Sequence, residues 1–84
     1  MVNTQIGHVI HYFDKIQVAV VKLSKGDLKI GDDIKLEDRN EKEFQQKVSS
    51  MQIEHASIDI AKAGDEFGLK VERAVKPRTK IYKV

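Results

Sequence analysis

The 84-residue sequence predicts an all-β domain, and two observations carry this prediction. Apolar and polar residues alternate with a period of two over most of the chain, which is the period of a strand with one buried face. Turn residues, including two Gly-Asp pairs, separate the alternating segments at short intervals. We expect six strands in a single domain spanning residues 1–84, arranged as a closed six-stranded Greek-key barrel.

The first two strands are expected over residues 6–13 and 16–23, with a tight turn at Asp14-Lys15 between them. In the first strand Tyr12 and Phe13 point to opposite faces, so at most one of them can lie in the core. The second strand is largely β-branched and carries apolar residues on both faces. We therefore expect it to be central in the sheet and well covered.

A short apolar piece at Leu28 and Ile30 leads into the turn Gly31-Asp32, where glycine can adopt a positive φ. The following strand, residues 33–37, alternates cleanly. The run from 44 to 55 then changes phase, because its apolar positions are even-numbered up to Val48 and odd-numbered afterwards. Such a slip predicts a β-bulge or bend near Ser49-Ser50.

Residues 56–62 are compatible with a short helical turn or an irregular loop. The turn Ala63-Gly64-Asp65 then introduces an alternating strand over residues 66–71. Pro77 excludes a central strand at its position because proline has no backbone N–H to donate. The last strand is expected over residues 79–84.

Composition excludes several classes of protein. Without cysteine there is no disulfide, no thiolate nucleophile and no cysteine-based zinc site. The longest apolar run, residues 18–21, is too short to cross a membrane, and the N-terminus shows no signal peptide. We expect a cytoplasmic protein that makes no membrane contact. Nucleotide-binding and hydrolase motifs are absent, so neither enzymatic activity nor a cofactor is expected.

The histidines and aspartates do not form a convincing catalytic or metal-binding set. His8 and His11 lie on opposite faces of one expected strand, which prevents convergent coordination, and His55 is distant in sequence. We therefore expect no metal. Asp32 and Asp65 could form a catalytic acid pair, but a Gly-Asp turn ordinarily uses its carboxylate to accept hydrogen bonds from nearby backbone N–H groups.

Basic residues concentrate at the C-terminus. Residues 70–84 carry a net charge of +5, against +2 for the whole chain, because Glu72 alone opposes six cations. These six cations are Lys70, Arg73, Lys76, Arg78, Lys80 and Lys83. Clustered cations favour contact with the phosphates of a nucleic acid. Alternatively, lysines protect an edge strand from pairing with other chains.

The stretch from Leu28 to Leu36, with its Leu-Lys-Ile-Gly-Asp turn, and the stretch from Ala61 to Leu69, with its Ala-Gly-Asp turn, resemble the second domain of translational GTPases. Residues 75–82 are similar to the closing segment of that domain. The family includes elongation factor Tu and initiation factor two, and the resemblance implies a β-barrel over nearly the whole chain. Small stand-alone translation-factor-like proteins are similar, as is a module at the C-terminus of some collagenase-type peptidases.

The resemblance also implies a pocket. In elongation factor Tu, the strand matching residues 50–54 and the turn matching residues 65–68 help to hold the aminoacylated end of tRNA. The candidate pocket residues by resemblance are Met51, Gln52, Glu54, Asp65, Glu66 and Phe67. No arginine matches that of the family in the first segment, and the guanine-recognition motifs are absent, so no GTP chemistry is implied.

These observations favour a non-catalytic binding module that contacts structured RNA, such as tRNA, rRNA or the ribosome, through a basic face. The alternative is a protein-interaction module that docks on a larger partner, such as a peptidase or a separate GTPase subunit. The alternative is motivated by the similar domains being usually tethered to larger partners. A pull-down from nuclease-treated extract distinguishes the two, because loss of a partner on nuclease treatment favours RNA contact.

Overall fold

The computed structural model describes residues 5–38, 42–54 and 56–84, and these residues form ten β-strands and no helix. The prediction of an all-β chain is confirmed. The strands are β1 Gln5–Phe13, β2 Val18–Leu23, β3 Asp27–Lys29, β4 Asp33–Glu37, β5 Glu43–Lys47, β6 Met51–Ile53, β7 Ala56–Ile58, β8 Ile60–Lys62, β9 Glu66–Lys70 and β10 Lys80–Lys83.

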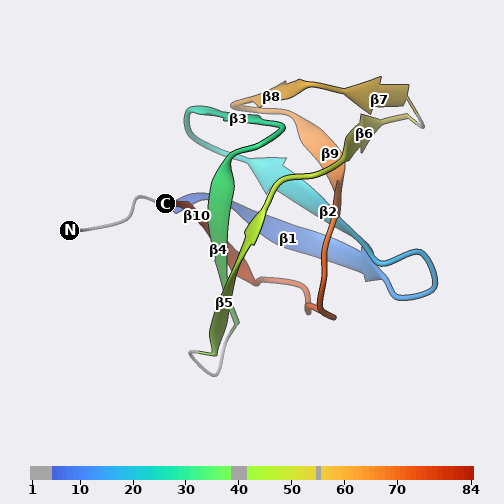
Figure 1. The fold of residues 1–84 in the computed structure, drawn as a ribbon, viewed down its shortest axis with the longest axis vertical. Coiled ribbons are helices and arrows are strands. Elements are labelled where there is room, and N and C mark those ends of the chain that lie inside the picture. The colour runs from blue at the N-terminus through green and yellow to red at the C-terminus, as the bar shows by residue number, and fades with distance from the viewer. Residues whose placement is uncertain (1–4, 39–41, 55) are drawn as a thin grey trace.

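Eight of these strands form one curled antiparallel sheet in the order β5-β4-β10-β1-β2-β9-β6-β7, and β3 pairs with β8 in a separate two-stranded sheet (Figure 1). The two outermost strands, β5 and β7, do not pair with each other. The prediction of a closed six-stranded barrel is therefore wrong. The chain is a half-barrel, in which a sheet curls around its core without completing the hydrogen-bonded ring.

The core fills the inside of the curl. It is made of apolar side chains that alternate along each strand, for example Val9 on β1, Val21 and Leu23 on β2, and Leu69 on β9, all of which are fully buried. In a chain of this length such a core must be continuous, because a small domain buries only about 60% of its potential surface. Each strand therefore contributes one inward face, as the period of two predicts.

The β1–β2 hairpin contains a register shift between Val9 and His11, which leaves Ile10 as the extra residue of a β-bulge. Beyond the bulge, Tyr12 packs against the core while Phe13 is exposed. The prediction that at most one of these two aromatic residues is in the core is confirmed. The bulge determines which of them points inward, because it reverses the phase of the strand.

The two Gly-Asp turns have the same hydrogen bonds. The carboxylate of Asp32 accepts a bond of 2.9 Å from the backbone N–H of Lys29, and that of Asp65 accepts one of 3.0 Å from Lys62. Gly31 and Gly64 have φ values of 95° and 94°. These carboxylates therefore cap turns, as expected.

Two segments differ from the prediction. The phase slip after Val48 is neither a bulge nor a bend within one strand, because Ser49 and Ser50 connect two separate strands, β5 and β6, at different positions in the sheet. Residues 56–62 are not a helical turn or an irregular loop but contain β7 and β8. Three-residue strands such as these are too short to show an alternating pattern.

A side chain partly closes the gap between β5 and the end of β9. Gln46 is a polar residue of the core, with 6% of its surface exposed. Its amide nitrogen donates to the carbonyl of Lys70 at 2.9 Å, and its amide oxygen accepts from the N–H of Glu72 at 3.0 Å. This single side chain makes the link that a backbone ladder makes in a closed barrel.

Candidate functional site

An apolar surface lies on the outer face of the β1–β2 hairpin, near its tip. The register places Phe13 opposite Val18 and His11 opposite Val20 on this face. Phe13 and Ile16 keep 45% and 58% of their surface exposed, and the rings of His11 and Phe13 meet edge to face at 4.5 Å. We call these five residues, His11, Phe13, Ile16, Val18 and Val20, the hairpin patch.

A hollow of about 510 Å³ adjoins the hairpin patch on its β9 and β6 side. It is lined by Ile16, Val18, Ser49, Ser50, Gln52, Gly68 and Lys70. Gly68 leaves this space open, since a Cβ at that position would lie 3.0 Å from Cγ1 of Val18. The hollow and the patch thus form one continuous surface with an apolar border.

The hairpin tip is fixed against β9. The N–H of Val71 donates to the carbonyl of Gln17 at 3.0 Å, and Nζ of Lys70 donates to the carbonyl of Ile16 at 3.4 Å. Gln17 has a φ of 55°, a conformation that a non-glycine residue rarely adopts. These contacts fix the backbone of the turn while the Ile16 side chain stays exposed, so the hairpin patch has a defined position relative to β9.

Strand β2 is central, as predicted, but it is covered on one face only. Ala19, Val21 and Leu23 are fully buried on the inner face, whereas Val18 and Val20 are half-buried on the outer face. Apolar residues thus lie on both faces of β2, and those of the outer face remain partly exposed within the described residues.

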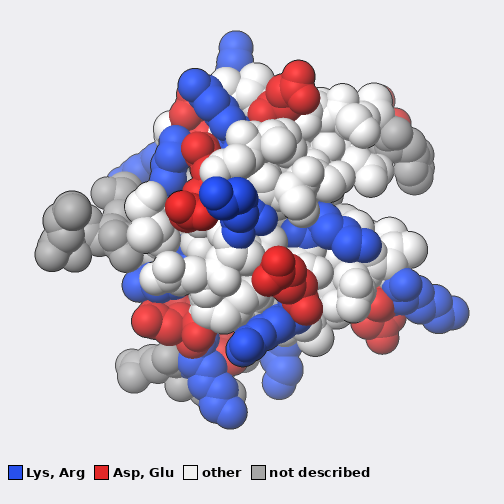
Figure 2. Space-filling model, viewed as in Figure 1, with Lys and Arg blue, Asp and Glu red and all other residues white. Residues whose placement is uncertain are grey.

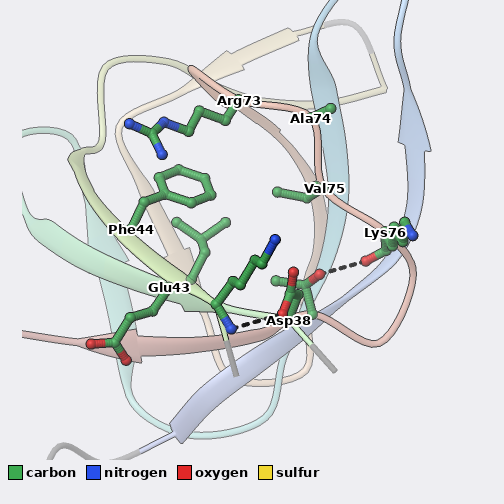
Figure 3. A pocket seen from close by; sticks show the side chains of 10 residues that line it. Asp38, Glu43, Phe44, Arg73, Ala74, Val75 and Lys76 are labelled. Carbon is green, nitrogen blue, oxygen red and sulfur yellow. Dashed lines mark hydrogen bonds between the residues drawn. The ribbon is translucent and has the colours of Figure 1, made fainter. Parts of the chain in front are cut away.

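A second cavity, of about 210 Å³, opens at the gap between β5 and residues 73–76 (Figure 3). The guanidinium of Arg73 lies over the ring of Phe44, with 5.5 Å between its central carbon and the ring centroid. Val75 points into the cavity from the opposite side, and Glu43 points away from it. The cavity thus combines an apolar lining with a cation at its mouth.

The six C-terminal cations do not gather at one place. Lys70 borders the hollow beside the hairpin patch, whereas Arg73 and Lys76 line the second cavity. Lys83 forms ion pairs with Asp27 at 3.6 Å and Asp32 at 3.3 Å. Lys80 and Arg78 are exposed in the chain around the start of β10. On the face seen in Figure 2, basic and acidic side chains are interspersed.

The six pocket residues expected from the resemblance do not converge either. Met51 and Phe67 are buried in the core, with 1% and 2% of their surface exposed. Asp65 caps its turn. Glu54 and Glu66 are exposed, and neither lines a cavity described above. Gln52 alone borders the hollow beside the hairpin patch.

Among the described residues, no group of three or more His, Asp or Glu side chains is placed to hold a metal ion. His55, and with it the prediction made for it, lies outside the described residues. The part of the chain that the structure describes also contains no helix long and apolar enough to cross a membrane.

Comparisons with known proteins identify relatives of this curled sheet. No family model matches the chain. An uncharacterised protease of Methanocaldococcus jannaschii is 36% identical over 78 residues, which are 93% of this chain and 19% of the protease. A collagenase of Porphyromonas gingivalis is 30% identical over 81 residues, 96% of this chain and 22% of the collagenase. The chain therefore spans about a fifth of the length of the curated relatives it matches.

Two solved structures share the fold. Both are of the C-terminal domain of a Geobacillus thermoleovorans protein assigned to the U32 peptidases, one of them its selenomethionine variant. Each superposes with a TM-score of 0.87, at 21% identity over 95% of this chain for the variant and 20% over 100% for the other. In both cases the match covers 99% of the solved domain.

These findings correct the expected resemblance. The matching proteins are a protease and collagenases, and the matching structures are peptidase C-terminal domains, so the assignment to the second domain of translational GTPases is wrong. The prediction of an RNA- or ribosome-binding module, which rested on that assignment and on the basic C-terminus, is wrong as well. The structure explains the error, because the Gly-Asp turns perform a local capping role that any tight connection between strands can use.

The hairpin patch and the cavity beside Phe44 are the surfaces that sequence reasoning missed. A signal for the patch was present, since residues 18–21 are apolar on both faces in a chain with little material for a second layer. The cavity carried no such signal, because Phe44 and Arg73 are 29 positions apart and meet only through the curl of the sheet.

Proposed function

We propose that this chain is a non-catalytic docking module of a peptidase, and that the hairpin patch is the surface through which it packs on the rest of the enzyme. The observation that carries the proposal is the uncovered outer face of β2, with Phe13 and Ile16 exposed beside it. Exposed aromatic and aliphatic side chains grouped on one rigid face are typical of protein contacts, and aromatic anchors commonly dominate their energy.

The relatives support a peptidase as the partner. Nearly all of this chain matches a fifth of a protease and a similar share of a collagenase, so in those proteins this region adjoins a much larger remainder. A surface of that remainder would provide the apolar layer that β2 lacks. The engagement of Asp32 and Asp65 with backbone N–H groups supports a non-catalytic role, because both carboxylates are already used in turns.

The test is to replace the matching region of the full-length Methanocaldococcus jannaschii protease with this chain, and to compare hydroxyl-radical footprints of the chimera and of the 84-residue chain. We expect oxidation of Phe13 and Ile16 to fall several-fold in the chimera. Ile30 is the internal control, because it is also exposed but lies in the turn after β3, away from the hairpin tip (Figure 1). Equal oxidation of Phe13 in both proteins would refute docking through the patch.

A further inference from the structure

Strand β5 has a free edge. In the antiparallel pair with β4, the N–H of Asp38 donates to the carbonyl of Lys42 at 2.9 Å, which identifies these two residues as a hydrogen-bonded pair. Such pairs alternate along an antiparallel ladder, so Phe44 and Gln46 also direct their backbone groups toward β4. The N–H and C=O groups of Glu43 and Gln45 consequently point away from β4.

The outward backbone groups of β5 lack backbone partners. Within the described residues, no backbone hydrogen bond joins Glu43 or Gln45 to a strand on the outer side. The facing segment, residues 73–75, makes no backbone hydrogen bond with the described residues either. An edge of this kind is a template for an additional strand.

The cavity beside this edge has an apolar lining and an excess of positive charge at its mouth. Leu36, Phe44 and Val75 line it together with the cations Lys42, Arg73 and Lys76. Within the described residues, none of these three cations forms an ion pair with an acidic side chain.

The two acidic residues at the cavity are already engaged. Glu43 pairs with Lys35 at 3.4 Å and points away from the cavity (Figure 3). The carboxylate of Asp38 accepts a hydrogen bond of 3.0 Å from the backbone N–H of Lys42. The described lining residues still carry three cations against two carboxylates, a net charge of +1, and Arg73 is held in place over Phe44.

We propose that the free edge of β5 and the adjoining cavity bind an extended peptide that carries a large apolar side chain next to a carboxylate. The peptide pairs with the backbone of Glu43 and Gln45 as an added strand. Its apolar side chain enters the cavity, whose 210 Å³ exceed the ~150 Å³ that accommodate a benzene molecule in an engineered protein cavity. The carboxylate meets the Arg73 guanidinium, which presents a planar fork suited to it.

This inference is independent of the proposed docking function. The hairpin patch lies on β1 and β2, whereas the peptide site lies on β5 and the segment after β9, so each can fail alone. Binding of a peptide is measured on the 84-residue chain without any peptidase.

The experiment titrates the 84-residue chain into a fluorescein-labelled hexapeptide, Thr-Val-Thr-Val-Thr-Phe with a free C-terminal carboxylate, and follows anisotropy. A second peptide, the same sequence extended by Asp after Phe and amidated at its C-terminus, presents the carboxylate on a side chain. A third peptide, amidated and without Asp, has no carboxylate. Binding of the first or the second peptide, at least tenfold tighter than the third, supports the site and shows which source of carboxylate it prefers. Equal binding of all three would overturn it.

Two further comparisons separate strand addition at this edge from general attraction. N-methylation of alternate backbone nitrogens in the preferred peptide is expected to weaken binding at least tenfold, because it removes N–H donors. Arg73→Gln should have a similar effect, whereas Lys80→Gln removes an exposed charge outside the cavity lining and should change binding less than twofold. Equal losses for Arg73→Gln and Lys80→Gln, or tight binding of the N-methylated peptide, would contradict the proposal.

Discussion

The side-chain amide of Gln46 on β5 donates a hydrogen bond of 2.9 Å to the backbone carbonyl of Lys70 on β9, although 24 positions separate them in the chain. The same amide accepts from the N–H of Glu72. A side-chain amide can make both bonds at once, because its nitrogen donates and its oxygen accepts. One buried side chain thus links two strands of the sheet that are not paired directly by a backbone ladder.

Replacing Gln46 is therefore expected to destabilise the fold. Gln46→Leu should lower the free energy of unfolding by about 1–3 kcal/mol, because it leaves the carbonyl of Lys70 and the N–H of Glu72 without their side-chain partner at a partly buried position. Gln45→Leu is the matched control, because its side chain is exposed on the same strand and its effect should stay within about 0.5 kcal/mol. Equilibrium denaturation in urea measures both. A cost for Gln46→Leu no larger than that of the control would refute the role of Gln46.

Gly7 lies where the backbone of β2 leaves no room for a side chain. A Cβ at this position would lie 2.5 Å from the carbonyl oxygen of Lys22, and a backbone atom in a sheet cannot easily yield. We expect Gly7→Ala to lower the free energy of unfolding by about 1–3 kcal/mol, the usual cost of overpacking.

Gly68→Ala is the comparison for Gly7→Ala. Its added Cβ would meet the terminal carbon Cγ1 of Val18 at 3.0 Å, and a side chain can adjust more readily than backbone. In thermal unfolding, Gly68→Ala should therefore lower the melting temperature less than Gly7→Ala does. The reverse order would show that the hairpin is more adaptable at Gly7 than its geometry indicates.

Four of the pocket residues that the resemblance implies should divide into two groups according to how much their replacement lowers the free energy of unfolding. Phe67→Ala and Met51→Ala should each cost about 2–5 kcal/mol, because both side chains are fully buried in the core. Gln52→Ala and Glu66→Ala remove exposed side chains and should cost less than about 0.5 kcal/mol. A neutral Phe67→Ala variant would place this residue outside the core and contradict the structure.

Asp32 gives the fold a defined pH dependence. The backbone N–H of Lys29, and after it the ammonium of Lys83, hold the pKa of the Asp32 carboxyl below its ordinary value of 3.8, although partial burial opposes this. A folded-state pKa lower than the unfolded one stabilises the fold above pH 3.8, and this contribution is lost as the pH falls through the folded pKa. The difference in unfolding free energy between wild type and Asp32→Asn should therefore be constant from pH 7 to about 5 and shrink below about 4.

Asp33→Asn serves as the control for this pH dependence. Asp33 is exposed, and within the described residues its side chain makes none of the hydrogen bonds that Asp32 makes. A pH series of urea unfolding curves should therefore show a larger pH-dependent difference for Asp32→Asn than for Asp33→Asn. If both variants follow wild type in parallel down to pH 3, Lys29 and Lys83 do not stabilise the ionised carboxylate.

Much of the fold could be predicted from the sequence, because it depends on local chemistry. The alternation along residues 33–37 and 66–70 and the two Gly-Asp turns depend on neighbours within a few positions, and the structure places strands and capped turns there. The open form of the barrel could not be predicted. It depends on whether the outermost strands β5 and β7 pair, which is decided by residues far apart in the chain. The link from Gln46 to Lys70 was equally hidden, because a lone glutamine in an alternating strand does not indicate that it faces the core.

The functional surfaces were harder to predict for a related reason. The apolar outer face of β2 was visible in the sequence, but whether this chain or a partner covers it depends on the arrangement of the sheet. The basic C-terminus was equally visible, yet Lys70, Arg73 and Lys83 project to different places. Charge that is close in sequence need not be close in space on strands and loops that change direction.

The most direct measurement of the docking proposal is the unfolding of one patch variant in two contexts. Phe13→Ser combined with Ile16→Ser changes exposed side chains, so the free energy of unfolding of the 84-residue chain should change by less than about 1 kcal/mol. In the chimeric Methanocaldococcus jannaschii protease, the same pair should lower the melting temperature of this region or separate its transition from that of the remainder. Identical small effects in both contexts would show that the hairpin patch is not a docking surface.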